Sequence, residues 1–168
     1  MSKTLLLLRH GKSDWSVAVD DFDRPLKKRG KKAATRIGKW LRAQSLTPDS
    51  IVSSPAVRAK STAEKVADQL DIDRSAIRFD ERLYQADLNT MRTVLSSCCS
   101  GASVVLIVGH NPDLETLLNF LVDGIETPED GKLLATATLA VLTMPDDWTS
   151  LSENCARLES ITRAAWLS

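Results

Sequence analysis

The sequence predicts an α/β protein: a three-layer α/β/α sandwich with a mostly parallel central sheet and an antiparallel edge strand. Two apolar runs, residues 4–8 and 104–108, are typical of central strands that are buried on both faces. Strand-like and helix-like segments alternate along the 168 residues, as they do in parallel sheets with helical crossovers. No repeat or low-complexity linker interrupts this pattern, so we expect one domain over residues 1–168.

In the first half of the chain, residues 4–8 form the first predicted strand. Residues 26–44 form the first predicted helix, because apolar residues recur there at helical spacing. The polar segment 11–25 between them has no clear period, which is typical of a functional or mobile loop. Residues 50–53 predict a short second strand. Ser54-Pro55 then opens a helix, since serine is a good N-cap and proline suits the first helical turn.

In the second half, we expect a short strand at 77–79 and a helix around 88–95. After the second buried run, Asn111-Pro112 repeats the pattern of a cap followed by proline and opens a helix at 114–121. Two final strands, expected to be antiparallel, are predicted at 139–143 and 156–162.

Composition excludes several classes of protein. Lys plus Arg and Asp plus Glu number 22 each, so the formal net charge is zero, which argues against a general nucleic-acid binder. The apolar run near the N-terminus is too short for a signal sequence or a membrane span. We therefore expect a cytoplasmic protein that does not bind membranes. The cysteines lack CxxC spacing, so no zinc site and no metal is expected.

Two histidines stand at equivalent places in the predicted sheet. His10 follows the first buried strand and His110 follows the second, and ligands of parallel sheets bind beyond these carboxyl ends. Arg9 precedes His10. Arg58 lies in the first turn of the helix opened by Ser54-Pro55, where a guanidinium joins free backbone N–H groups and the positive end of the helix dipole. Together these side chains predict a phosphate site.

Three ordered segments resemble the motifs of the histidine phosphatase superfamily. They are Leu8-Arg9-His10-Gly11, Ser53 to Ala59 with Thr62-Ala63, and Val108 to Pro112. Within the superfamily, the chain resembles the small SixA-type phosphohistidine phosphatases. This narrower resemblance rests on its size and on Asp21-Phe22-Asp23-Arg24-Pro25-Leu26 running into Arg29-Gly30. Lys12 stands where mutases of the superfamily usually have Glu or Gln, which disfavours a mutase.

The resemblance implies a mechanism that needs no cofactor. His10, in its neutral form, attacks phosphorus and becomes phosphorylated, and water then hydrolyses the phosphohistidine. Arg9, Arg58 and His110 hold the non-bridging oxygens, with a protonated His110 adding positive charge. Phosphoryl transfer depends mainly on positioning and charge neutralisation, so arginines can provide what Mg²⁺ provides in other enzymes.

Other candidate residues are less specific. Glu81 is expected either to protonate the leaving group or to be a surface glutamate, and Asp113 to lie at a helix N-terminus. Ser13 is expected to donate to phosphate. Arg24 is expected to contact substrate from the loop or to form a surface salt bridge, and the Thr136 hydroxyl is expected to reach the pocket.

The expected partner is a phosphorylated protein, with phosphohistidine in a signalling protein as the leading substrate. A small phosphate ester is the first alternative, and a non-catalytic module that binds phosphorylated partners is the second. The basic run at residues 27–32 is expected to be a solvated helix start or to meet an acidic partner protein, rather than nucleic acid. The sequence does not indicate an oligomeric state.

Overall fold

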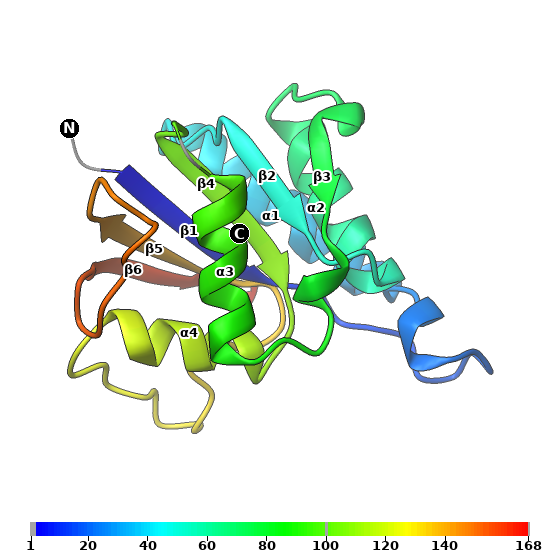
Figure 1. The fold of residues 1–168 in the computed structure, drawn as a ribbon. Helices are drawn as coiled ribbons and strands as arrows, with labels where there is room; N and C mark the ends of the chain where they lie inside the picture. The colour runs from blue at the N-terminus through cyan, green and yellow to red at the C-terminus, as the bar shows by residue number, and fades with distance from the viewer. Residues whose placement is uncertain (1–2, 100, 168) are drawn as a thin grey trace.

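The computed structural model of the protein describes residues 3–99 and 101–167, which are built around one six-stranded sheet (Figure 1). The strand order is β3-β2-β4-β1-β5-β6. β3, β2, β4 and β1 are parallel, whereas β5 runs antiparallel to β1 and β6 antiparallel to β5. The strands are β1 (Lys3–Arg9), β2 (Ser50–Ser53), β3 (Ile77–Phe79), β4 (Val104–Gly109), β5 (Thr138–Met144) and β6 (Arg157–Arg163). The predicted mostly parallel sheet with an antiparallel edge is confirmed.

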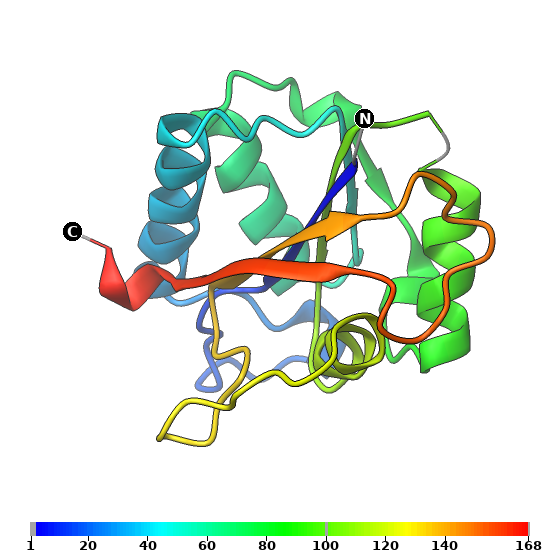
Figure 2. The same ribbon diagram turned by 90° about the vertical axis from the view of Figure 1, so that its left-hand side faces the viewer.

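Helices cover both faces of this sheet and complete the three layers (Figures 1 and 2). α1 and α2 lie on one face, and α3 and α4 lie on the other. Their bounds are α1 (Lys28–Ala43), α2 (Val57–Gln69), α3 (Leu88–Cys98) and α4 (Asp113–Leu121). In the part of the chain that the structure describes, none of these helices is long and apolar enough to cross a membrane.

The leucines of β1 contribute to the hydrophobic cores on both faces of the sheet. Successive side chains of a strand point to opposite faces, so alternate leucines enter different cores. Leu5 and Leu7 pack into the core beneath α3 and α4, while Leu6 and Leu8 pack into the core beneath α1 and α2. All four side chains are fully buried, which explains why the run has no polar residue.

Both predicted serine or asparagine caps are wrong. α2 begins at Val57 with Ala56 at its N-cap position, and α4 begins at Asp113 with Pro112 there. Neither cap makes a side-chain hydrogen bond. The physical reason is that Ser54 and Asn111 direct their side chains to other partners at the carboxyl edge of the sheet.

This edge is set by the register of β1 with β4. Arg9 is paired with Gly109, so the next residue of each strand is a histidine that leaves the sheet at the same level. The His10 amide donates a 3.2 Å hydrogen bond to the carbonyl of Gly109, which extends the pairing to the carboxyl edge of the sheet. His10 and His110 are therefore brought together by the sheet itself.

Candidate active site

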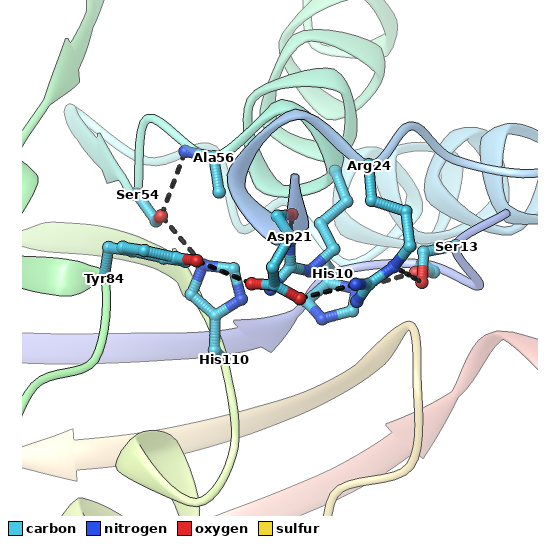
Figure 3. Close-up of polar contacts among 10 residues, drawn as sticks. His10, Ser13, Asp21, Arg24, Ser54, Ala56, Tyr84 and His110 are labelled. Carbon is cyan, nitrogen blue, oxygen red and sulfur yellow. Dashed lines mark hydrogen bonds and ion pairs between the residues drawn. The ribbon is translucent and has the colours of Figure 1, made fainter. Parts of the chain in front are cut away.

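His10 and His110 lie side by side at this edge (Figure 3). Their ring centroids are 5.2 Å apart, with an angle of 55° between the ring planes. Both side chains are buried. Burial makes the protonated, charged form of each imidazole costly, so both rings favour the neutral form.

The backbone fixes the tautomer of His10. Its Nδ1 lies 2.7 Å from the carbonyl oxygen of Gly11, and a carbonyl accepts a hydrogen bond, so Nδ1 must hold the proton. Burial lowers the pKa of His10 to about 3, with further lowering by His110, Arg58 and Arg9, although the bond to Gly11 opposes the shift. At neutral pH the ring is therefore neutral, and its Nε2 lone pair is available for attack.

The loop after His10 is packed against two helices. The Gly11 amide donates to Thr62 Oγ1 at 3.1 Å, and the same hydroxyl donates to the Arg58 carbonyl of α2 at 2.8 Å. On the α1 side, a Cβ on Gly11 would lie 2.6 Å from the oxygen of Gly30, and one on Gly30 would lie 2.3 Å from the oxygen of Lys12. Such short approaches exclude any side chain, so both glycines are needed for this contact.

Arg58 is held by the loop residue Asp21. Its Nη1 donates to the Asp21 carbonyl at 2.6 Å, and its Nη2 donates to Asp21 Oδ2 at 3.0 Å. The same carboxylate accepts from Tyr84 and from Arg24. These contacts, with Tyr84 the largest cause, lower the pKa of Asp21 well below its usual range, so it is ionised at neutral pH. Figure 3 shows this carboxylate between His110 and Arg24.

Arg9 is oriented by the segment around Leu134. Its Nη1 donates to the carbonyl of Leu134 at 3.1 Å, and Asn111 Nδ2 donates to the same carbonyl at 2.8 Å. Glu115 closes this network by accepting from Asn111 Nδ2 at 2.9 Å and from the Leu134 amide at 3.3 Å. Asn111 thus helps to hold the Leu134 carbonyl that binds Arg9, and it is not the helix cap expected from its sequence position.

His110 contacts Ser54 through Nε2 at 2.8 Å, and the Ser54 hydroxyl also accepts from the Ala56 amide at 3.2 Å. Burial lowers the pKa of His110 to about 4, and Arg58 lowers it further. The expectation of a protonated His110 is therefore wrong for the free protein, in which the ring is neutral. When the Ser54 hydroxyl donates to Nε2, the ring proton of His110 is on Nδ1, which is then a hydrogen-bond donor.

Three buried nitrogens in this arrangement have no hydrogen-bond partner within the described residues: Arg9 Nε, Arg58 Nε and His110 Nδ1. Their side chains line one cavity of about 290 Å³ together with His10, Lys12, Ser13, Trp15, Arg24, Asn111 and Thr136. Among the residues that the structure describes, no acidic side chain lines this cavity. Buried donors are normally paired, so these three indicate a site for an anionic ligand, although Asn111 Oδ1, an acceptor on a residue that lines the same cavity, is unpaired too. In the described ranges, no three His, Cys, Asp or Glu side chains gather as metal ligands.

The structure brings Ser13, Arg24 and Thr136 to this cavity, as expected. Ser13 Oγ accepts from Arg24 Nε at 2.9 Å. Arg24 is buried, forms a salt bridge with Asp21, and stacks on Trp15 with its guanidinium carbon 3.6 Å from the ring centroid. Arg24 therefore forms the expected salt bridge, but from a buried position, and its contact with substrate stays a prediction.

Glu81 lies outside the cavity. It is exposed at the start of a short 3₁₀ helix, Glu81–Leu83, and lines neither the cavity of His10 nor its neighbour. The neighbouring cavity, of about 400 Å³, is lined by Asp21, Arg58, Tyr84, Gln85, His110, Asn111, Pro112 and Asp113. Asp113 accepts from the Ala86 amide at 2.8 Å, and burial raises its pKa. A carboxyl group thus lies beside the site, but at Asp113 rather than at Glu81.

Asp21 and Tyr84 are site residues that the sequence reasoning did not identify as such. Tyr84 OH donates to Asp21 at 2.6 Å, and its ring makes an edge contact with His110 at 5.6 Å between centroids. They come from segments 63 residues apart, and neither follows a strand end of the kind that located the histidines. The signal that existed was the Asp21–Leu26 motif, of which Arg24 alone was given a role.

Comparison with known proteins agrees with this geometry. The family described as the histidine phosphatase superfamily (branch 1) matches residues 5–95. The chain is 31% identical over 156 residues to an uncharacterised protein of Mycobacterium tuberculosis, covering 90% of this chain and 96% of that protein. It is 27% identical over 143 residues to the phosphohistidine phosphatase SixA of Escherichia coli, covering 84% and 86% of the two chains.

The fold is similar to that of a proposed SixA phosphohistidine phosphatase from Nakamurella multipartitia. The two structures align with a TM-score of 0.83 and 28% sequence identity. The alignment covers 97% of this chain and 96% of the other. The similarity therefore includes the antiparallel edge and the C-terminal segment, which the family match at residues 5–95 does not reach.

Proposed function

Because this chain belongs to the histidine phosphatase superfamily, we propose that it hydrolyses phosphohistidine in a signalling protein, with His10 as the nucleophile. One observation supports this most directly. Arg9 Nε, Arg58 Nε and His110 Nδ1 are buried and unpaired around the cavity that His10 lines. A phosphoryl group has three non-bridging oxygens, which three such donors match in number, and the two guanidiniums complement its negative charge.

In the first step, His10 Nε2 attacks phosphorus and the bond from phosphorus to the substrate's imidazole nitrogen breaks. The Nδ1 proton of His10 stays on its bond to Gly11, so the carbonyl stabilises the positive ring that forms. The substrate imidazole departs without a strong acid, because its second ring nitrogen can already be protonated. In the second step, water attacks phosphorus, His10 regains its lone pair, and phosphate leaves.

The cations of the site supply the neutralisation that this chemistry needs. Arg9, Lys12, Arg24 and Arg58 all line the cavity. We propose that they make a metal ion unnecessary, and we expect chelation with EDTA to leave the rate unchanged. A loss of activity that added Mg²⁺ restores would contradict this part of the proposal.

The test is to incubate the protein with a histidine-phosphotransfer domain that bears radiolabelled phosphohistidine. We expect the substrate to lose label, label to appear on the phosphatase after an alkaline quench, and His10→Ala to abolish both. If the substrate keeps its label while a small phosphate ester is hydrolysed, the phosphohistidine assignment is wrong. If His10→Ala binds the phosphorylated domain as the native protein does, and neither protein turns it over, the chain is a binding module.

A phosphatase for phosphate esters is the second candidate function. An alkoxide is a poor leaving group and needs a proton, which a buried carboxyl can provide. Asp113 supports this alternative, since it lines the cavity that shares Arg58 and His110 with the site, and burial raises its pKa. The relative rates for a phosphohistidine and an ester substrate distinguish the two functions.

A further inference from the structure

The exposed side of α1 is strongly basic. The helix Lys28–Ala43 has seven Lys or Arg residues and no Asp or Glu. Five of these cations, with Thr35 and with Lys65 of α2, line a surface hollow of about 400 Å³: Lys28, Lys31, Lys32, Arg36 and Lys39. Within the described residues these five form no ion pair. Since the whole chain has zero net charge, this basic face is a local concentration of charge.

This concentration of positive charge destabilises α1. Cations are unfavourable near a helix N-terminus, where the dipole is positive, yet the first turn of α1 is basic and contains no acidic residue. Lys28 and Lys32, and then Lys32 and Arg36, are like charges at a spacing of four, which further destabilises a helix. An arrangement with such a cost to folding is typical of a surface that binds an anionic partner.

A second feature lies beside the site. Segment 15–22 exposes large apolar side chains: Trp15 at 76%, Val17 at 41%, Val19 at 48% and Phe22 at 38%. Trp15 lines the cavity of His10, and Phe22 makes an edge-on ring contact with Tyr84, which lines the neighbouring cavity. Exposed aromatic and aliphatic groups around a small polar cavity are typical of a protein interface with an apolar centre and a charged rim.

The loop that carries the apolar segment is held against the start of α1. The Lys27 amide donates to the Lys12 carbonyl at 2.8 Å, and Gly30 packs against the loop after His10. The blue segment before α1 projects from the carboxyl edge of the sheet (Figure 1). A partner that covers the cavity from this side would contact both features at once.

We propose that the apolar segment 15–22 and the basic face of α1 together dock a folded phosphoprotein whose surface is apolar beside the phosphorylated residue and acidic farther away. This inference rests on the proposed function, which it extends from the phosphoryl group to the protein that bears it. The apolar side chains contact the partner around the cavity. The cations of α1 steer its acidic surface toward His10 and increase the rate of productive encounter.

A membrane surface fits the observations less well. Basic helices with nearby aromatic residues also bind anionic lipids. The apolar segment, however, lies among Asp14, Asp20 and Asp23, and anionic headgroups would repel these carboxylates. A protein surface can offer apolar and charged groups in the required mixture. Nucleic acid could stack on Trp15 and Phe22, but it would leave the exposed Val17 and Val19 without a role.

The experiment compares two double charge reversals that change the net charge equally. Lys32→Glu/Lys39→Glu alters the basic face. Lys3→Glu/Arg157→Glu is the control, because both residues lie at the opposite end of the sheet from His10. Each is assayed with free phosphohistidine and with a phosphorylated, acidic histidine-phosphotransfer domain at about 0.05 M and about 0.3 M NaCl. A third variant, Val17→Ser/Val19→Ser, tests the apolar segment.

We expect Lys32→Glu/Lys39→Glu to lose about tenfold in kcat/KM for the domain at low salt, and to lose most of its salt dependence. Val17→Ser/Val19→Ser should raise KM for the domain with little change in kcat. Free phosphohistidine should be hydrolysed equally by all variants, and the control should match the native protein throughout.

Several results would overturn the docking surface. They are equal losses in the test and control reversals, no loss in either, or hydrolysis of free phosphohistidine without any action on the folded domain. Sedimentation with phosphatidylserine vesicles that Lys32→Glu/Lys39→Glu abolishes, while the domain is still turned over normally, would assign the basic face to membranes instead. If the native protein hydrolyses neither phosphohistidine substrate, the proposed function itself fails and the docking surface falls with it.

Discussion

The Asp21 backbone and side chain together take both terminal nitrogens of Arg58, at 2.6 Å and 3.0 Å, and leave its Nε as a buried, unpaired donor. A guanidinium has five N–H donors in a rigid plane, so fixing one edge fixes the direction of the rest. Asp21 therefore determines how Arg58 faces the cavity of His10. It also connects Arg58 to Arg24 and Tyr84, so one loop carboxylate sets the position of three side chains.

Asp21→Asn tests this relationship. The substitution keeps the size of the side chain but removes the charge that holds Arg58, and we expect kcat/KM to fall on the order of tenfold. Asp21→Glu should restore part of the loss. Asp23→Asn is the matched control, since it removes a neighbouring exposed charge in the same short 3₁₀ helix. Steady-state kinetics that are the same for Asp21→Asn and Asp23→Asn would contradict the positioning role.

The two buried histidines should make the protein less stable in mild acid. Their folded pKa values are about 3 and about 4, below the ordinary value of 6.5 that they regain on unfolding. Between these values the unfolded chain binds more protons, so the free energy of unfolding falls as the pH falls below about 6.5. Each histidine can contribute a slope of about 1.4 kcal/mol per pH unit.

Urea unfolding at several pH values between about 7 and about 5 measures this slope, before most carboxylates begin to protonate. The variant His10→Gln/His110→Gln should show a much shallower slope over the same range. The histidines would not be the source of the acid sensitivity if the native protein and this variant lost stability in parallel.

Gly30→Ala should disturb the active site, although Gly30 does not line its cavity. The added Cβ would lie 2.3 Å from the carbonyl oxygen of Lys12, so α1 or the loop after His10 must move. Overpacking of this kind typically costs about 1–3 kcal/mol, and we expect lower thermal stability together with a lower kcat. Gly109→Ala is the control, because its Cβ would make an ordinary contact of 3.6 Å with Leu114. Unchanged stability and kcat in Gly30→Ala would show that the loop yields without consequence.

Removal of carboxyl groups distinguishes the leaving-group chemistry. Glu81 is exposed and lies outside both cavities, so Glu81→Gln should leave the hydrolysis of phosphohistidine and of esters unchanged. If Asp113 protonates ester leaving groups, Asp113→Asn should lower the ester rate by about a hundredfold or more and spare phosphohistidine. A steep loss of ester hydrolysis in Glu81→Gln instead would assign the acid role to Glu81.

Much of the fold follows from local patterns in the sequence. The runs at 4–8 and 104–108 became β1 and β4, because a strand buried on both faces needs continuous apolar residues. The short strand at 77–79 and the two antiparallel strands at the end were also found where expected. The two caps were predicted wrongly because serine and asparagine can bond to any nearby polar group. Here Ser54 contacts His110, and Asn111 contacts Leu134 and Glu115.

The site residues that directly follow buried strands could be predicted from the sequence, whereas those in loops were less predictable. His10 and His110 follow two buried strands directly, and the register of β1 with β4 brings them to the same level. The role of Asp21 depends on how segment 11–25 folds back over α2, and no periodic pattern in that segment indicates it. The neutral state of His110 depends on its burial and its charged neighbours, which exist only once the chain has folded.

The hairpin of β5 and β6 provides a place to attach the protein to a surface. β5 begins beside the His10 edge and ends beside Lys3, so the connection from Met144 to Arg157 lies at the far end of the sheet from the cavity. A peptide tag or a surface-attachment point inserted there would leave the mouth of the site open. By contrast, one residue added to or deleted from β1 would send the leucines that follow it to the wrong layer and turn His10 away from the cavity. Immobilised enzyme made through the hairpin would therefore present its site to large partners, which single-molecule or surface-based assays require.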